Sequence, residues 1–398
     1  MKIKRVILLL SIFLPLFGCI DEILIDSKDY QARLVVEGTI TNEEGPYYIK
    51  LYKSSPVNEF NEAPIEGCTV SIIEKSENSE TTEILTEVEP GLYRTDKNGV
   101  KGTIGNSYKL SILTSNNVKY ESNYQEILNP VGIDSVYPKL QFKKTEEYPN
   151  GLPGYQFYVT TEMANNNKTY FLWQAEETYE YTVDFELYDI YFGRAELDTN
   201  KILRDSIINN YKYNLYRCWN TKRVNRIFTG ETSQLVEPQI IKQPLHFVGT
   251  DTKKLQEKYS LLLKQITVNK TTHLFWKQVN EQTSEENFLT AYQPYNVTGN
   301  INNIDNPEEV IFGYFIVGSI VKKRIFVDSP NQPFYYNKCS LVTDPATIME
   351  LYKSIPPPVP FYLIEYSNQL GYGVLLDEIC VNCTLEEGNN KKPDFWIQ

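Results

Sequence analysis

The chain has 398 residues and a formal net charge of −12, with 51 acidic and 39 basic residues. Proteins that bind nucleic acid take most of their affinity from lysine and arginine on phosphates, so this acidic balance predicts no nucleic-acid partner. Tyrosine is abundant, with 30 residues against three methionines and two histidines, and its strand propensity favours a β-rich protein.

Residues 1–18 have the organisation of a lipoprotein signal peptide. The leader MKIKR carries three basic residues, and an apolar run of 12 residues follows up to Phe17. This run is too short to span a bilayer, which needs about 20 residues in a helix, and Pro15 weakens such a helix further. The next letters, LFGC, end at Cys19 and resemble a bacterial lipobox, in which the cysteine is acylated and becomes the mature N-terminus.

Cys19 is therefore the expected lipidation site, which would hold the protein in the outer membrane. A diacylglycerol with an amide-linked chain supplies the several acyl chains that stable anchoring requires. Residues 20–22 (IDE) resemble the acidic export signal that sends Bacteroidota lipoproteins to the cell surface. The alternative interpretation is that they are simply part of a solvated acidic tether over residues 19–30. The alternative is a soluble secreted protein with a free cysteine near its start. Loss of the three basic leader residues changes the net charge to −15.

Residues 31–130 are expected to form a small β-sandwich. LVVEGTIT and YYIKLYKSS alternate on either side of a turn at residues 42–46, and further short strands follow roughly every 8 to 12 residues. The order of these segments resembles the transthyretin-like or carboxypeptidase-regulatory-type immunoglobulin-like domain. In that pattern Cys68 takes a position usually filled by alanine, so we expect a small buried hydrophobic residue there.

Residues 131–398 are expected to form a larger antiparallel β domain with one or a few helices, after a connection rich in proline and glycine at 127–138. KTYFLWQAEETYEYTVDFELYDIYF alternates, with Tyr170 and Leu172 on one face and Phe171 and Trp173 on the other. KLQEKYSLLLKQITVN continues the sheet.

Helical spacing in KTTHLFWKQVNEQTSEEN then predicts a helix, capped by Asn269 or Thr271. Its expected buried face contains Leu274, Phe275, Gln278 and Val279. EEVIFGYFIVGSIVKKRIFV predicts two further strands, and the proline run at 355–361 predicts a polyproline II surface loop.

Several segments together resemble a domain-of-unknown-function family of Bacteroidota outer-membrane lipoproteins. They are LVVEGTIT with GPYYIKL, YFLWQAEETYE, NVTGNI followed by FGYFIVGSIVKKRIFV, and CVNCTLEEGNNKKPDFW. The resemblance spans nearly the whole chain, although a single Gly388 stands where the family usually has two adjacent glycines. Members are commonly encoded beside a TonB-dependent receptor, so the resemblance implies a TonB-dependent outer-membrane barrel as partner. It implies no chemistry for any residue.

The sequence CVNC places two cysteines at a spacing used for zinc sites, redox pairs and disulfides. Zinc needs about four ligands, and only single cysteines stand elsewhere. A redox pair belongs at the start of a helix after a strand, where its thiol pKa falls, and GYGVLLDEIC does not provide that position. In an oxidising compartment we expect two disulfides, in one of three possible pairings, with Cys68 unpaired. Their four members are Cys218, Cys339, Cys380 and Cys383.

The remaining motifs predict no catalytic residue, no metal ligand and no cofactor. His246 and His273 are the only histidines, and no G-x-S-x-G elbow is present to supply a serine nucleophile. For His273 a surface or packing role is expected. GNINNIDNPEE at 299–309 offers oxygen ligands for calcium but lacks the EF-hand spacing, and a loop with Asn and Asp in left-handed turn positions is the preferred interpretation.

The sequence therefore favours a surface-exposed outer-membrane lipoprotein that acts as an accessory or ligand-binding partner of a TonB-dependent transporter. A flexible tether would keep the domain close to its partner, so a weak interface would suffice. The alternative is a structural or assembly subunit of an outer-membrane complex. An extracellular hydrolase is the third hypothesis, and the sequence nominates no residue for it.

Overall fold

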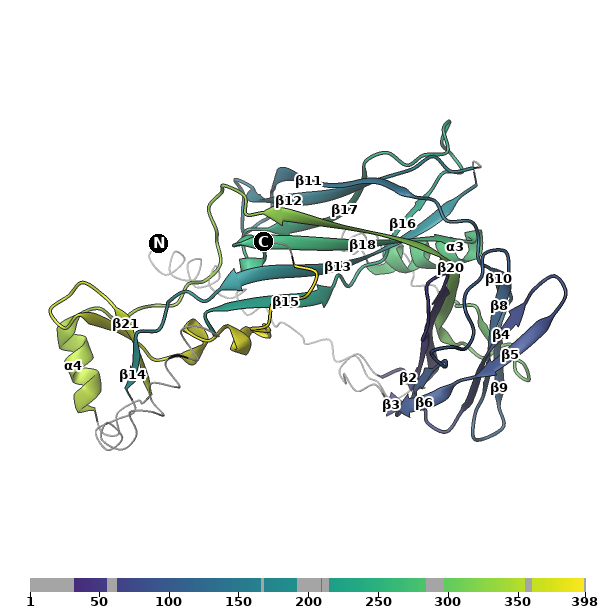
Figure 1. Cartoon of the computed structure of the whole chain (residues 1–398), viewed down its shortest axis with the longest axis horizontal. Coiled ribbons are helices and arrows are strands. Elements are labelled where there is room, and N and C mark those ends of the chain that lie inside the picture. The colour runs from purple at the N-terminus through teal and green to yellow at the C-terminus, as the bar shows by residue number, and fades with distance from the viewer. Residues whose placement is uncertain are drawn as a thin grey trace, which may run out of the picture.

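The computed structural model describes residues 32–55, 63–165, 168–191, 209, 215–283, 297–354 and 360–396. Within these ranges the chain is mainly β, with a sandwich followed by a larger antiparallel unit, which confirms the predicted fold class (Figure 1). The signal peptide, the tether with Cys19 and most of the proline run at 355–361 lie outside the described residues. No described helix has the length and apolar character needed to cross a membrane.

The first unit is a β-sandwich whose two sheets enclose one core. Its first sheet contains β1 (Leu34–Thr41), β2 (Tyr48–Lys53), β3 (Ala63–Pro64), β6 (Thr86–Glu89) and β7 (Leu92–Arg94). Its second contains β4 (Thr69–Lys75), β5 (Glu80–Ile84), β8 (Ser107–Leu113), β9 (Lys119–Ser122), β10 (Gln125–Glu126) and β19 (Ile301–Asn303). In β1, Val36 and Ile40 enter the core while Glu37 faces outward, as period-2 alternation requires.

The second unit is a larger two-layer β structure. Its main layer contains β13 (Tyr170–Thr182), β15 (Arg217–Arg223), β16 (Phe228–Glu231), β18 (Lys258–Val268) and β20 (Phe312–Asp328). Its second layer contains β11 (Ile133–Lys143), β12 (Leu152–Thr161) and β17 (Gln243–Gly249). Phe171 and Trp173 pack between the layers, whereas Tyr170 and Leu172 pack on the opposite face, which confirms the faces predicted for β13.

Strand β20 joins the two units. Its first half pairs with β1 in parallel, from Phe312 to Gly318, and its second half pairs with β18 antiparallel, from Ser319 to Asp328. The prediction of two strands here is wrong, because one 17-residue strand continues through both units. A Cβ at residue 318 would lie 2.5 Å from the Thr267 carbonyl oxygen, so glycine at this position lets β20 lie close to β18. Strand β19 and half of β20 thus complete the sandwich, which extends beyond the predicted boundary at residue 130.

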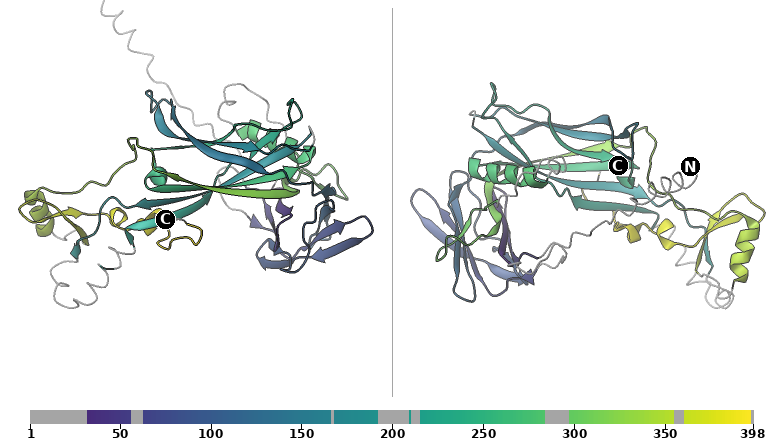
Figure 2. Two further views of the ribbon diagram at one scale, coloured as in Figure 1. Left: turned by 45° about the horizontal axis from the view of Figure 1, so that its top comes forward. Right: turned by 180° about the vertical axis from the view of Figure 1, so that it is seen from behind.

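Helix α3 (Lys270–Thr283) covers one face of the main layer (Figure 2). Asn269 caps it, because its side-chain oxygen accepts a hydrogen bond of 2.8 Å from the Thr272 backbone N–H. Phe275 and Val279 pack on the sheet as predicted, together with Trp276. Leu274 and Gln278 instead face solvent, with 40 % of the Leu274 surface exposed.

A small three-stranded sheet lies at the end of the molecule opposite the sandwich (Figure 1). It contains β14 (Asp189–Tyr191), β21 (Phe361–Glu365) and β22 (Tyr372–Leu375), and α4 (Pro345–Lys353) packs beside it. The described 3-10 helices are η3 (Lys253–Leu255), η5 (Glu378–Cys380) and η6 (Cys383–Glu386). Asp344 caps α4 by accepting a 2.9 Å hydrogen bond from the Thr347 backbone N–H.

Candidate functional site

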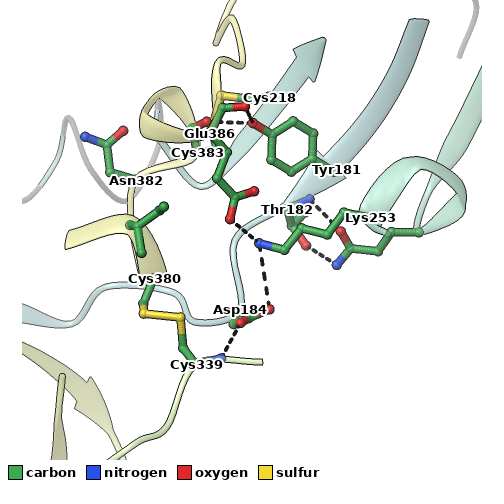
Figure 3. Close-up of polar contacts among 12 residues, drawn as sticks. Tyr181, Thr182, Asp184, Cys218, Lys253, Cys339, Cys380, Asn382, Cys383 and Glu386 are labelled. Atoms are coloured by element: carbon green, nitrogen blue, oxygen red, sulfur yellow. Dashed lines mark hydrogen bonds and ion pairs between the residues drawn. A yellow bond between two sulfur atoms is a disulfide. The ribbon is translucent and has the colours of Figure 1, made fainter. Parts of the chain in front are cut away.

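The four predicted cysteines form two disulfides, and the structure selects one of the three pairings left open by the sequence. Cys218 of β15 is joined to Cys383, and Cys339 is joined to Cys380 (Figure 3). Cys68 is free and half-buried against the sandwich core, so it contacts that core without being enclosed by it. The CVNC motif therefore fastens the C-terminal segment to the second unit and to the loop before α4.

Polar contacts around the disulfides hold the same segment. Lys253 binds the Glu386 carboxylate at 2.8 Å and lies 4.0 Å from Asp184 (Figure 3). The Tyr181 hydroxyl donates a 2.6 Å hydrogen bond to the Cys383 carbonyl oxygen, and burial raises its pKa. A Cβ at Gly388 would lie 2.3 Å from that hydroxyl oxygen. We interpret this cluster as a structural clamp.

His246 belongs to a buried network between the two layers of the second unit. Its Nε2 lies 3.0 Å from the Tyr259 hydroxyl, which donates a 3.0 Å hydrogen bond to Glu177. The other Glu177 oxygen accepts a 2.6 Å hydrogen bond from Lys254. Burial lowers the pKa of His246 to about 4, the effect of Glu177 being smaller, so the ring is neutral at pH 7.

His273 lies on the other face of the main layer, on α3. It is 2 % exposed, its ring contacts Tyr170, and its Nε2 is 3.8 Å from Glu231. Burial lowers its pKa below the ordinary value. The sheet thus separates the two histidines, and the packing role expected for His273 agrees with its burial.

The segment 299–309 is held by its own amides. Asn300 exchanges two hydrogen bonds with the Phe315 backbone, at 2.8 and 2.9 Å. Asn303 accepts from the backbone N–H groups of residues 305 and 306, and the Tyr120 hydroxyl donates to Glu309 at 3.1 Å. The expectation of left-handed Asn and Asp is wrong, since the described non-glycine residues with positive φ lie elsewhere. The described residues contain no group of three or more His, Cys, Asp or Glu arranged to hold a metal ion.

A groove of about 550 Å³ lies where the shared sheet passes from one unit to the other, and we call it the junction groove. β1 and β2 form one wall, β13, β18 and β20 form the floor, and α3 closes one end. Side chains from the first unit include Glu37, Glu43, Tyr48 and Lys50. Side chains from the second include Gln174, Arg223, Lys264, Trp276 and Lys322. This volume falls within the range of about 300–1,000 Å³ typical of ligand sites.

The groove residues belong to no motif that is recognisable in the sequence. Its basic members stand on strands, where alternate charged residues are typical of a solvated face. The KKR run in β20 was the available signal, because it interrupts an otherwise apolar strand. Lys323 of that run points to the opposite face, where its ammonium donates to the carbonyl oxygens of residues 133 and 134.

Comparison with known proteins identifies the family of the chain but no characterised relative. No curated protein matches it. Residues 20–324 match the family described as Domain of unknown function (DUF4249), a span that includes the sandwich, the main layer and most of β20. Since this match covers well over half of the chain, the protein belongs to that family.

Proposed function

We propose that the protein is a lipid-anchored, surface-exposed outer-membrane protein that binds a ligand beside a TonB-dependent transporter. The observation that carries the binding role is the junction groove, whose walls come from both units. The lipobox-like sequence ending at Cys19 supports the anchor. Family resemblance supports the transporter as partner.

The geometry favours binding over turnover. His273 is buried and His246 is largely enclosed, on opposite faces of the main layer, and neither lines the groove. Burial lowers the pKa of both rings, which keeps them neutral. A ligand in the groove would instead contact tyrosine, tryptophan, lysine and arginine side chains, which suit recognition.

Fractionation and affinity purification test the proposal. Cys19→Ser should release the protein from the membrane fraction and abolish incorporation of labelled palmitate. Cys68→Ser, which removes a cysteine that forms no disulfide, should leave both unchanged. The tagged wild-type chain, purified from gently solubilised outer membranes, should retain a TonB-dependent barrel. Membrane retention of the Cys19 variant contradicts the anchor, and purification without any barrel contradicts the partnership.

Deletion of the gene separates the proposal from an assembly role. A ligand-binding partner of one transporter should be required for growth on one nutrient. General envelope defects, with no nutrient dependence, would instead support a structural subunit of an outer-membrane complex.

A further inference from the structure

We propose that the junction groove binds a small polyanion, whose carboxylate or phosphate oxygens lie between Arg223, Lys264 and Lys322. This inference rests on the proposed function, because it names the class of ligand that the binding protein takes. It follows from the arrangement of charges on the groove floor.

Two lysines of the floor are direct cross-strand partners. Lys264 of β18 pairs with Lys322 of β20 in the antiparallel register, and both line the groove. Directly opposed side chains in such a pair have Cβ atoms about 4.5–5.5 Å apart, and like charges at this distance destabilise the sheet. An anion between the two ammonium groups removes this repulsion.

The neighbouring carboxylates do not neutralise the floor. Glu176 lies 3.7 Å from Lys264 and 3.4 Å from Arg324, so one carboxylate serves two cations. Glu43 forms an ion pair with Lys322 from the edge of the sandwich. Arg223, which pairs with Glu176 in the strand register, is exposed and forms no ion pair within the described part of the chain.

Four cations therefore face two carboxylates, which leaves a local charge of +2 on a chain whose net charge is −12. Glu37 and Lys50, which also line the groove, cancel each other. An excess of one sign of charge in a cleft concentrates ligands of the opposite sign. Arg324 is already engaged, since its guanidinium lies 3.6 Å from the centre of the Phe395 ring in the C-terminal tail. Arg223 has no ion-pair partner in the described part of the chain, and a ligand would compete with Glu176 for Lys264 and with Glu43 for Lys322, which favours a ligand with at least two negative charges.

The walls limit the ligand to a small molecule with an apolar or planar part. Trp276 and Tyr314 line the groove beside the cations. Glu37 lies on the β1 wall, where it would repel a long polyanion that continued across it. The groove thus suits a compact polycarboxylate or phosphate ester.

Calorimetric titration of the full lipidated chain in detergent, at low ionic strength, tests the proposal. Citrate represents polycarboxylates, pyrophosphate represents phosphates, and spermidine is the cationic control. At least one of the two anions should bind, with an affinity that falls as salt is added. Lys264→Gln should weaken binding about tenfold, because a hydrogen bond to a charged group is lost. Lys144→Gln, at an exposed lysine in the β11–β12 loop, should have no effect.

Glu43→Gln separates the proposal from a simple loss of folding. This substitution removes the carboxylate that competes for Lys322, so it should tighten anion binding several-fold. Failure of both anions to bind, or equal affinities for wild type, Lys264→Gln and Glu43→Gln, would overturn the ligand class. If the barrel still co-purifies in that case, the transporter partnership survives. If an anion binds but no barrel co-purifies, the ligand class survives and the transporter partnership is contradicted.

Discussion

The buried neutral state of His246 makes stability depend on pH in a range above the titration of ordinary carboxylates. The pKa of a histidine in an unfolded chain is about 6.5, and in the folded protein burial lowers that of His246 to about 4. Between these values the unfolded chain binds a proton that the folded protein does not. The stabilisation is therefore complete above pH 6.5 and is lost as the pH falls towards 4.

The magnitude follows from the two pKa values. Linkage predicts a loss of about 1.3 kcal/mol in the free energy of unfolding between pH 7.5 and 5.5, and about 3 kcal/mol by pH 4. His246→Gln should remove this contribution, and its free energy of unfolding should fall less steeply with pH by the same amount. The variant should also be less stable at pH 7.5, because the ring stacks on Phe157.

Urea unfolding followed by tryptophan fluorescence measures the effect. All four tryptophans lie in the second unit, and Trp173 is in the same core as the Phe157 ring that contacts His246. Val159→Ala is the matched control, since it destabilises this core without removing a titratable group. The control should keep the wild-type pH dependence. An unchanged pH dependence in His246→Gln would show that the histidine is not held neutral by burial.

Three further predictions concern the contacts that join distant segments. Gln265→Leu should lower the free energy of unfolding by about 2 kcal/mol, because the Trp173 indole N–H loses its acceptor and the Val131 carbonyl oxygen loses a donor. Gln278→Leu, at an exposed site on α3, should change it by less than about 0.5 kcal/mol in the same urea assay. Gly313→Ala should destabilise the parallel pairing of β1 and β20, since φ at residue 313 is 85° and a Cβ there would lie 2.1 Å from a β1 carbonyl oxygen. Amide hydrogen exchange should become faster in β1 and stay unchanged in the β13–β18 pairing. Unchanged exchange in β1 would contradict this prediction. Replacing Cys218 and Cys383 by serine removes a disulfide between residues 165 apart and should lower the free energy of unfolding by about 2–5 kcal/mol. Limited proteolysis should then cut the C-terminal segment first. A C-terminal segment that resists cleavage would refute the clamp.

Local features of the chain were predictable because their cause is local. Alternation along β13 depends only on the two-residue period of a strand, so Tyr170 and Trp173 could be assigned to opposite faces without knowledge of the neighbouring strands. The helix after Asn269 was predictable for the same reason, since its cap and its apolar spacing lie within a few residues. The lipobox-like leader is a linear signal, and the prediction that Cys19 is acylated depends on no fold.

Other features required the tertiary structure. Composition and the expected oxidising compartment predicted that four cysteines pair, but the choice among three pairings depends on which distant segments meet. Cys218 meets Cys383 only because the tail folds back against β15. Leu274 illustrates the same limit, because helical spacing cannot say which part of an apolar face the sheet will cover.

The sequence by itself determined a β-rich protein with a helix at 270 and a disulfide-forming cysteine set, since each depends on composition or on contacts between near neighbours. Tertiary structure alone decided that one strand serves two units and that Lys264 lies opposite Lys322. Strand pairing brings together residues far apart in the chain, and a shift of one position would turn these lysines to the other face of the sheet. The junction groove and its charge exist only in that register.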